Sequence, residues 1–237
     1  MISQPLRKTT PVALLLFLLI EVAGTVSGQH SKPAKPGART SAKTYSIAHA
    51  QSQITVLLTQ EGMLRKLHPT HAVAVKTFSG RVQLLAGDES KAVVEVEAET
   101  RSLTNIDKNM SSFERDGFQD VLHKNVLESD RFPNIRFRSV SVTNLQTAGD
   151  SRSFTLNGDL TLHGVTKRVA FPVTVIIKDG QLRATGEEKI RQTDFGMKPY
   201  SGGLGSIKIS DEMKVSFVIM ATAQQSHSTV KQSKDKS

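Results

Sequence analysis

The chain contains no cysteine, no tryptophan and only two tyrosines among its 237 residues. Without cysteine it can form no disulfide, so the folded part must be held by its own core. A chain of this length can build such a core, since a domain of this size buries roughly 70% of its unfolded surface. The scarcity of aromatic rings, with no basic stripe between them, argues against a surface that stacks nucleic-acid bases.

Long hydrophobic runs are also absent, except for one near the amino terminus. Arg7 and Lys8 precede a run from Val12 to Ile20, and smaller residues follow as far as Gly28. This order is typical of a secretory signal peptide, with cleavage near Gly28. An uncleaved anchor is the alternative, but a run of about nine residues is shorter than the roughly 20 that span a bilayer. We therefore expect a secreted or periplasmic protein with no integral membrane span after signal removal.

The net charge of +9 is concentrated at the two ends of the chain. Residues 1–43 hold six bases and one acid, and residues 224–237 hold three bases and one acid. Residues 44–223 are nearly neutral, with 22 bases and 20 acids, so we expect no nucleic-acid partner. The predicted parts are a signal peptide (1–28), a flexible basic linker (29–43), one folded domain (44–223) and a disordered basic tail (224–237).

Three segments in the last third of the chain place apolar residues at every second position. This is the spacing of one face of a β-strand. The turn signal His163-Gly164 separates the first two segments, and the hairpin signal Asp179-Gly180 follows the second. The alternating apolar residues are Phe154, Leu156, Leu160 and Leu162; Val169, Phe171, Val173, Val175 and Ile177; and Met213, Val215, Phe217, Ile219 and Ala221.

Shorter strand signals fill the first half of the domain. One strand is expected to run from Ala72 to Phe78 and to turn at Ser79-Gly80 into the next, and another turn is expected at Gly87-Asp88. The remaining expected strands cover Tyr45–Ile47, Ile54–Leu58, Val82–Leu85, Ala92–Glu99, Ile135–Val142 and Leu182–Ile190.

One segment breaks the β pattern. Between Ser111 and Leu127, the residues Phe118, Val121 and Leu122 recur at helical spacing. Ser111 and Glu114 form a candidate capping box at its start. Eight or nine antiparallel strands with one inserted helix predict an all-β fold, either a closed barrel or a sandwich. In a barrel, the helix could lie across one mouth.

Three motifs resemble those of a known family. Residues 129–139 (SDRFPNIRFRS) are similar to the pattern FP-x-I-x-F-x-S, residues 157–167 (NGDLTLHGVTK) to G-x-LT-x-HGVTK, and residues 193–197 (TDFGM) to an R-x-DFG loop. Over about residues 45–223 the chain resembles the YceI-like family of secreted, lipocalin-like barrels. The resemblance implies an eight-stranded, extended antiparallel barrel around one long isoprenoid or fatty-acyl chain, with no further cofactor.

The chain departs from this family pattern at two places. Many relatives carry Gly-His-x-His before the third strand, whereas this chain has His68 and His71, and Gln192 stands where relatives carry arginine. The two histidines are the best polar pair for a ligand head group or a metal ion. One loop supplies only two ligands, so we expect no metal site, and we place His71 at the polar mouth of the barrel.

Hydrophobic burial alone could hold a ligand in such a barrel, since each buried CH₂ is worth about 0.8 kcal/mol. We assign the lumen to the inward-facing residues of the clearest strands, and a lid to one face of the helix. The alternatives are a lumen filled by its own side chains and a helix that only packs on the barrel end. The expected lumen residues are Val94, Val96, Phe137, Leu156, Leu160, Leu162, Phe171, Val173, Val175, Phe217 and Ile219, and the lid residues are Phe118, Val121 and Leu122.

The sequence shows no nucleophile, base and orienting group in an enzyme-like pattern, so we assign no catalytic residue. The predicted function is to carry or sequester a long apolar lipid. Two other functions stay open: a metal, heme or enzymatic role for the loop histidines, and a structural envelope protein whose sheet face meets another protein. A homodimer is compatible with the resemblance.

Overall fold

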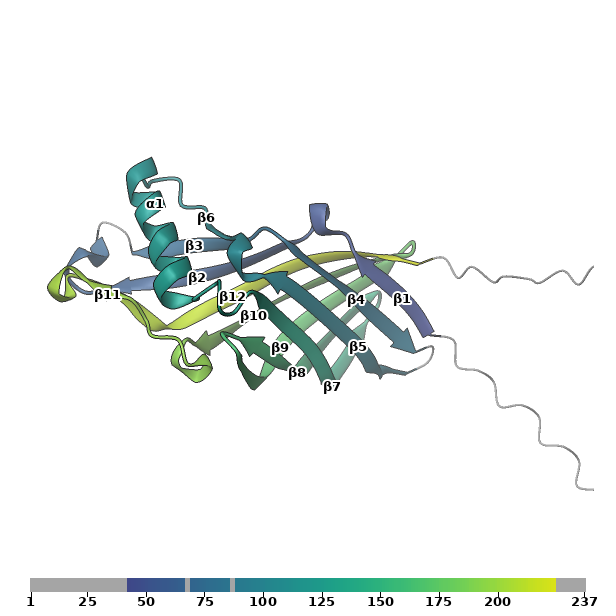
Figure 1. Ribbon diagram of the computed structural model, residues 1–237. Helices are drawn as coiled ribbons and strands as arrows, with labels where there is room; N and C mark the ends of the chain where they lie inside the picture. The colour runs from purple at the N-terminus through teal and green to yellow at the C-terminus, as the bar shows by residue number, and fades with distance from the viewer. Residues whose placement is uncertain (1–41, 67–68, 86–87, 225–237) are drawn as a thin grey trace, which may run out of the picture. The chain divides into compact units, whose positions relative to one another are not determined.

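The computed structural model describes residues 42–66, 69–85 and 88–224, which form one antiparallel sheet that closes on itself (Figure 1). Pairing of β12 with β1 closes a ring of eight strands, so the predicted all-β, eight-stranded barrel is confirmed. In order around the ring, the strands are β1 (Ala42–Ile47), β4 (Phe78–Leu85), β5 (Asp88–Glu99), β7 (Asn134–Ala148), β8 (Ser151–Leu162), β9 (Val165–Lys178), β10 (Gln181–Arg191) and β12 (Ile207–Ala223).

Three strands of the ring are halves of longer, bent strands. β1 and β2 lie one after the other along β12, β3 continues directly into β4, and β5 leads into β6. The halves outside the ring pair with one another in the order β2, β3, β6. The elements involved are η1 (His49–Gln51), β2 (Gln53–Glu61), η2 (Met63–Lys66), β3 (Thr70–Val75), η3 (Thr100–Ser102) and β6 (Leu103–Asn105).

The three bends lie side by side in the sheet. His49 Nε2 lies 2.7 Å from the carbonyl oxygen of Lys76, and the N–H of Lys76 donates to the carbonyl of Ser102. The N–H of Glu99 donates to the carbonyl of Thr77. On one side of this row β5 pairs with β7, whereas on the other side β6 pairs with β3. The sheet therefore ends at β6, and a helix follows there.

The helix predicted over Ser111–Leu127 is confirmed as α1 (Ser112–Val121), which continues into a π-helical turn, η4 (Leu122–Val126). Its capping box is present: Ser111 Oγ accepts from the N–H of Glu114, and the carboxylate of Glu114 accepts from the N–H of Ser111. α1 lies beside β3 and β6 (Figure 1).

The expected turn at Ser79-Gly80 is wrong. Both residues lie within β4, and the chain changes direction earlier, at the bend between Val75 and Phe78. A Cβ at Gly80 would lie 2.3 Å from the carbonyl oxygen of Glu95, so this glycine lets β5 approach closely instead of forming a turn.

Several elements are longer than the sequence predicted, or were missed. β7 continues to Ala148, and β12 already begins at Ile207. The short strands β6 and β11 (Ser201–Gly202), and the single turns η5 (Thr193–Phe195) and η6 (Gly203–Gly205), had no clear signal. By contrast, the hairpin at Asp179-Gly180 is confirmed, with both residues at positive φ.

Other predictions concern residues that lie outside those described by the structure. These are the signal peptide (1–28), the basic tail beyond Gln224, His68, and Gly87 of the expected Gly87-Asp88 turn. Most of the predicted linker is also outside it, although β1 begins at Ala42. Within the described residues, no helix has the length and apolar character needed to cross a membrane.

Candidate functional site: the barrel lumen

The barrel encloses a cavity of about 720 Å³. The structure brings together all the residues that the sequence assigned to the lumen, together with the three lid residues on α1 and η4, and His71. Their contact with a ligand stays a prediction. The residues in question are Val94, Val96, Phe137, Leu156, Leu160, Leu162, Phe171, Val173, Val175, Phe217 and Ile219 in the lumen, and Phe118, Val121 and Leu122 on the helix.

The cavity follows most of the length of β8. Its lining on this strand runs from Arg152 through Phe154 and Leu156 to Leu162. At about 3.3 Å per residue this stretch covers roughly 33 Å of strand. Barrel strands are tilted by about 35–45°, which leaves on the order of 25 Å along the barrel axis. The cavity is therefore long and narrow, as a single extended chain requires.

Phenylalanines and glycines alternate across five strands of the inner surface. Phe137, Gly158, Phe171, Gly186 and Phe217 lie on β7, β8, β9, β10 and β12 respectively. A Cβ at Gly158 would lie 2.4 Å from Phe137, and one at Gly186 would lie 2.6 Å from Phe217. The ring centroid of Phe171 lies 6.0 Å from that of Phe137 and 5.8 Å from that of Phe217. The glycines give the rings room against the sheet, which leaves the lumen open.

Sequence reasoning missed these two glycines, although a glycine within an alternating strand is a signal of close approach. It also missed the lumen residues contributed by β2, β3 and β12 near the helix. These include Val56, Leu58, Val73, Val75, Ile209 and Met213.

The polar side chains that line the cavity are not spread evenly along it. Arg152 lies near the β7–β8 hairpin, at the end of β8 away from the helix. The others belong to β2, β3, α1 and the segments between β10 and β12, which meet near the helix. They are Gln60, His71, Glu114, Gln192 and Tyr200.

His71 lies within β3 rather than in the preceding loop, and only 6% of it is exposed. Its Nδ1 lies 2.8 Å from Asp107 Oδ2, and its Nε2 lies 3.0 Å from Gln60 Oε1. Its ring packs against Phe118 of α1, with the ring centroids 5.1 Å apart. His71 is therefore a hydrogen-bonded part of the wall beneath the helix.

Asp107 ties this group together. Its carboxylate accepts from the N–H of Ala72 at 2.8 Å and from Asn105 Nδ2 at 3.0 Å, in addition to the contact with His71. Burial raises the pKa of Asp107, but the hydrogen bonds from Ala72, Asn105 and His71 outweigh it and hold the pKa below the ordinary value. The carboxylate is thus charged at neutral pH.

A second polar group fixes the helix to β6. Gln119 Oε1 accepts from the N–H of Asn105 at 3.0 Å, and Gln119 Nε2 donates to the carbonyl of Leu103. The same amide donates to His123 Nε2 at 2.8 Å, so His123 Nδ1–H is left to donate to Ser129 Oγ at 2.8 Å. Burial lowers the pKa of His123, and this favours the neutral ring that these contacts need.

His71 is held by protein contacts rather than placed as a metal ligand. Among the described residues, no group of three or more His, Cys, Asp or Glu side chains is placed to hold a metal ion. Both ring nitrogens of His71 face oxygen atoms of Asp107 and Gln60, so neither nitrogen is directed at an open site.

The segments of the three sequence motifs support the same end of the barrel. His163 Nε2 lies 3.1 Å from Glu128 Oε1, and its ring packs on Phe132 with the centroids 4.2 Å apart. His163 thus joins the β8–β9 turn to the segment after η4 through the carboxylate of Glu128. Gln192 donates from Nε2 to the carbonyl of Ser210 at 2.8 Å. These contacts position the wall next to the helix.

The family model of the YceI-like domain matches residues 45–221. The chain belongs to the YceI-like family. Two solved structures have a similar fold, each with a TM-score of 0.56. BcnA of Burkholderia cenocepacia is 21% identical, with 74% of this chain and 99% of BcnA covered.

The second is a polyisoprenoid binding domain of Saccharophagus degradans implicated in plant cell wall breakdown. It is 14% identical, and the match covers 76% of this chain and 98% of that domain. At these identities the likeness shows a shared YceI-like fold. The comparison with curated protein sequences yields no match.

Proposed function

We propose that this YceI-like protein is a secreted or periplasmic binding protein that carries or sequesters one long apolar lipid in the barrel lumen. The observation that carries the proposal is the apolar lining along β8 and β9, from Phe154 to Leu162 and from Phe171 to Ile177. An isoprenoid or fatty-acyl chain is the ligand class that such a lining fits, because burial of each CH₂ contributes about 0.8 kcal/mol.

Two further points support this ligand class. The cavity volume of about 720 Å³ falls within the roughly 300–1,000 Å³ typical of ligand sites. The S. degradans domain of the same fold is described as polyisoprenoid binding. The proposed function includes no covalent step, and the polar groups near the helix orient or admit the ligand rather than react with it.

The experiment is to purify the full chain from a host that supplies membranes, and to identify any bound lipid by native mass spectrometry and solvent extraction. A lumen-filling variant tests where the lipid lies. Ala184 lines the cavity on β10, between Val175 of β9 and Ile219 of β12, so Ala184→Trp places an indole in the lumen. Its neighbour Arg183 is exposed, and Arg183→Trp is the matched control.

We expect lipid to co-purify with the wild type and with Arg183→Trp, and to be reduced at least about tenfold in Ala184→Trp. Thermal unfolding of both variants shows whether Ala184→Trp is folded, and Val94→Phe on β5 provides a smaller second filling change. Folded wild-type protein that yields no lipid, or equal lipid in all variants, would overturn the proposal.

A further inference from the structure

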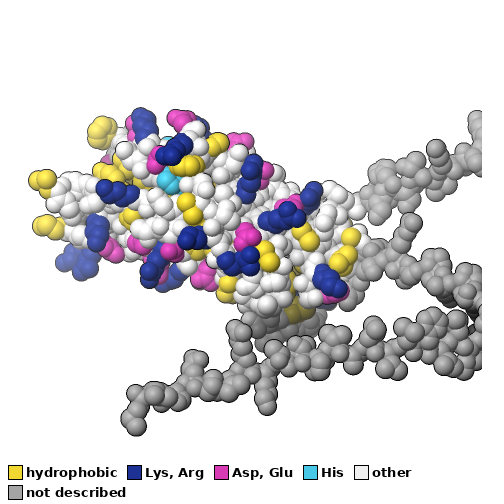
Figure 2. Space-filling model, turned by 60° about the horizontal axis from the view of Figure 1, so that its bottom comes forward, with side chains coloured by type: hydrophobic (Ala, Val, Ile, Leu, Met, Phe, Trp, Pro, Cys, Tyr) yellow, Lys and Arg dark blue, Asp and Glu magenta, His cyan; other side chains and the backbone are white. Residues whose placement is uncertain are grey.

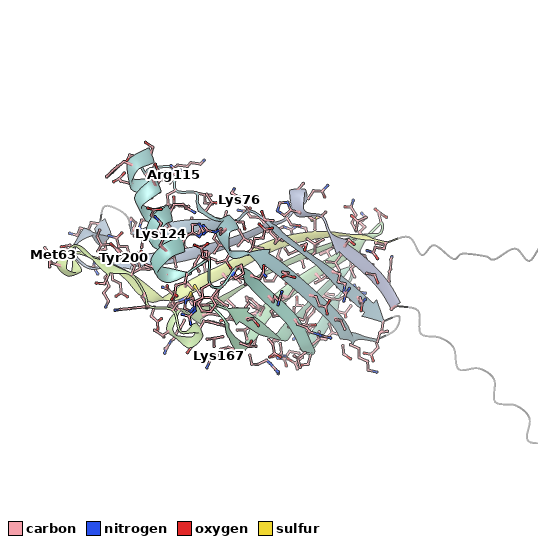
Figure 3. The ribbon with its side chains drawn as sticks, viewed as in Figure 1. Met63, Lys76, Arg115, Lys124, Lys167 and Tyr200 are labelled. Atoms are coloured by element: carbon pink, nitrogen blue, oxygen red, sulfur yellow. The ribbon has the colours of Figure 1, made fainter. Side chains whose placement is uncertain are left out.

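Two loops at one end of the barrel carry strongly exposed apolar side chains. Met63 in η2 is 84% exposed, and Leu204 in η6 is fully exposed. The loops touch, since a Cβ at Gly62 would lie 3.0 Å from the carbonyl oxygen of Ser206. Figure 3 shows Met63 at the extreme left of the barrel, and Figure 2 shows hydrophobic side chains protruding at that end beside Lys and Arg side chains. We call residues 61–66 and 197–208 the η2–η6 tip.

The backbone holds Leu204 outward in an unfavourable conformation. Gly203, Leu204 and Gly205 have φ angles of 56°, 54° and 88°, so a leucine occupies the left-handed region that suits glycine or asparagine. A leucine here gains no burial within the chain that would offset this strain. Strained residues of this kind are concentrated at sites that contact other molecules.

The η2–η6 tip is also basic. It contains Arg65, Lys66, Lys198 and Lys208, with Glu61 as its only acid. Glu61 is paired with Lys208, whose Nζ lies 3.2 Å from Glu61 Oε2. The excess of positive charge beside exposed apolar side chains matches a lipid surface that carries anionic head groups.

The η2–η6 tip borders the lumen. Tyr200 and Ile207, which flank η6, both line the cavity. Tyr200 folds over Gly202, where a Cβ would lie 2.3 Å from the tyrosine hydroxyl. A surface that contacts Met63 and Leu204 would therefore lie next to the end of the lumen where Tyr200 stands (Figure 3).

We propose that the η2–η6 tip docks on an anionic lipid bilayer, with Met63 and Leu204 inserted among the lipids and the basic side chains against the head groups. The purpose of docking, transfer of lipid into or out of the lumen, rests on the proposed function. Docking itself is measured without reference to lumen contents, so the two can fail separately.

The test uses single-cysteine labelling of the full chain, which is direct because the native sequence has no cysteine. Leu204→Cys and Met63→Cys each carry an environment-sensitive nitrobenzoxadiazole fluorophore. Val140→Cys is the matched control, because Val140 is an exposed apolar residue on β7, outside the tip. The probes are vesicles of phosphatidylcholine alone and with 30% phosphatidylglycerol. A local fluorophore separates tip docking from any binding by the basic ends of the chain.

We expect a blue shift and brighter emission at positions 63 and 204 with phosphatidylglycerol vesicles, weaker in high salt, and no change at position 140. In vesicle sedimentation, the double variant Met63→Ser, Leu204→Asn should bind at least about tenfold more weakly than wild type, while Val140→Ser should bind as wild type does.

Three results would overturn the proposal. The fluorophores at positions 63 and 204 could stay unchanged while the protein sediments, which would assign binding to the ends of the chain. All three positions could respond equally. The fluorophore at position 204 could respond to protein concentration without vesicles, which would assign the η2–η6 tip to contact with a second copy. Loss of docking with retained lumen lipid would leave the proposed function intact.

Discussion

The two sides of the lumen are built in different ways. The side formed by β7, β8, β9 and β10 is a continuous ladder whose inner surface is apolar. The side formed by β6 and α1 has no ladder between sheet and helix, and none of the residues Ser112–Val121 is fully buried. There the attachment combines the packing of Phe118 on His71 with the hydrogen bonds of Gln119 to β6, and Arg115 donates to the carbonyls of Asp107 and Met110 in the segment before the helix.

This difference separates stability from access. Apolar burial is non-directional, and in the ladder it is shared by strands that pair along most of their length. A helix that is not part of the ladder, and of which no residue in Ser112–Val121 is fully buried, can detach while the sheet stays intact, which is how local opening with a low free energy arises. We therefore expect changes in the ladder to alter global unfolding, and changes at the helix to alter local opening.

The largest effect is expected from Phe171→Ala in the ladder. Phe171 is buried between the rings of Phe137 and Phe217, so its removal should lower the free energy of unfolding by about 3 kcal/mol or more. Urea denaturation measures this. Phe113→Ala is the matched control, because Phe113 is an exposed phenylalanine of α1 and should cost less than about 0.5 kcal/mol. Equal costs for the two variants would contradict the comparison.

Gln119→Leu should weaken the attachment of α1 to β6, on the helix side of the lumen. The leucine keeps the size of the side chain but leaves the N–H of Asn105 and the carbonyl of Leu103 without their partner, at a cost of about 1–3 kcal/mol. We expect hydrogen exchange to become faster in α1 and η4 while β8 and β9 keep their protection. The control is Lys124→Leu, which removes only an exposed pair with Asp120. Faster exchange in β8 and β9 as well would show that the helix and ladder unfold together.

Sequence reasoning predicted the apolar ladder and the helix itself, but not the polar contacts that attach the helix, for a physical reason. Alternation along one strand fixes which residues face inward, so Phe154 to Leu162 and Val169 to Ile177 could be assigned without knowing their neighbours. The helix side depends on pairs far apart in sequence, such as Gln60 with His71 and Asn105 with Gln119. No periodicity reports such pairs.

The bends illustrate the same limit. The sequence predicts two strands, Ala72–Phe78 and Val82–Leu85, joined by a turn at Ser79-Gly80, because a glycine after a serine is a common turn signal. The structure instead bends at Lys76, whose carbonyl faces His49 and whose N–H faces Ser102. These neighbours come from the other two bends, so the position of each bend is decided jointly by three strands.

Thr100→Val should stabilise the fold, whereas the two changes above destabilise it, and the size of the effect should be smaller. Thr100 lies in η3, at one of the three bends. Among the described residues, Thr100 Oγ1 is a buried side-chain oxygen with no hydrogen-bond partner. Valine has the same shape without the hydroxyl, so we expect stabilisation by about 1 kcal/mol. Ser102→Ala in the same turn is the control, because Ser102 Oγ donates to the Glu99 carbonyl and its loss should destabilise. A destabilised Thr100→Val variant would show that the hydroxyl is satisfied.

The smallest expected effect is a dependence of helix attachment on pH. The pKa of His123 in the folded chain is lowered, mainly by burial, from its ordinary value of 6.5. At a pH between the lowered pKa of the folded state and 6.5, His123 binds more protons in the unfolded or detached segment than in the folded one. Attachment of the helix therefore weakens as the pH falls below about 6.5. A protonated His123 Nε2 would also face the amide donor of Gln119. Asp107 adds a similar loss only at lower pH, below its ordinary value of 3.8.

We expect hydrogen exchange in α1 and η4, corrected for the intrinsic rate, to be faster at pH 5.5 than at pH 7.5, while that in β8 and β9 is unchanged. His123→Gln should abolish the difference, and His49→Gln, at the exposed bend, should retain it. An equal pH dependence in the ladder and the helix would show that acid acts on the whole barrel. A dependence confined to the helix would identify His123 as the group that links proton binding to the closure of this side of the lumen.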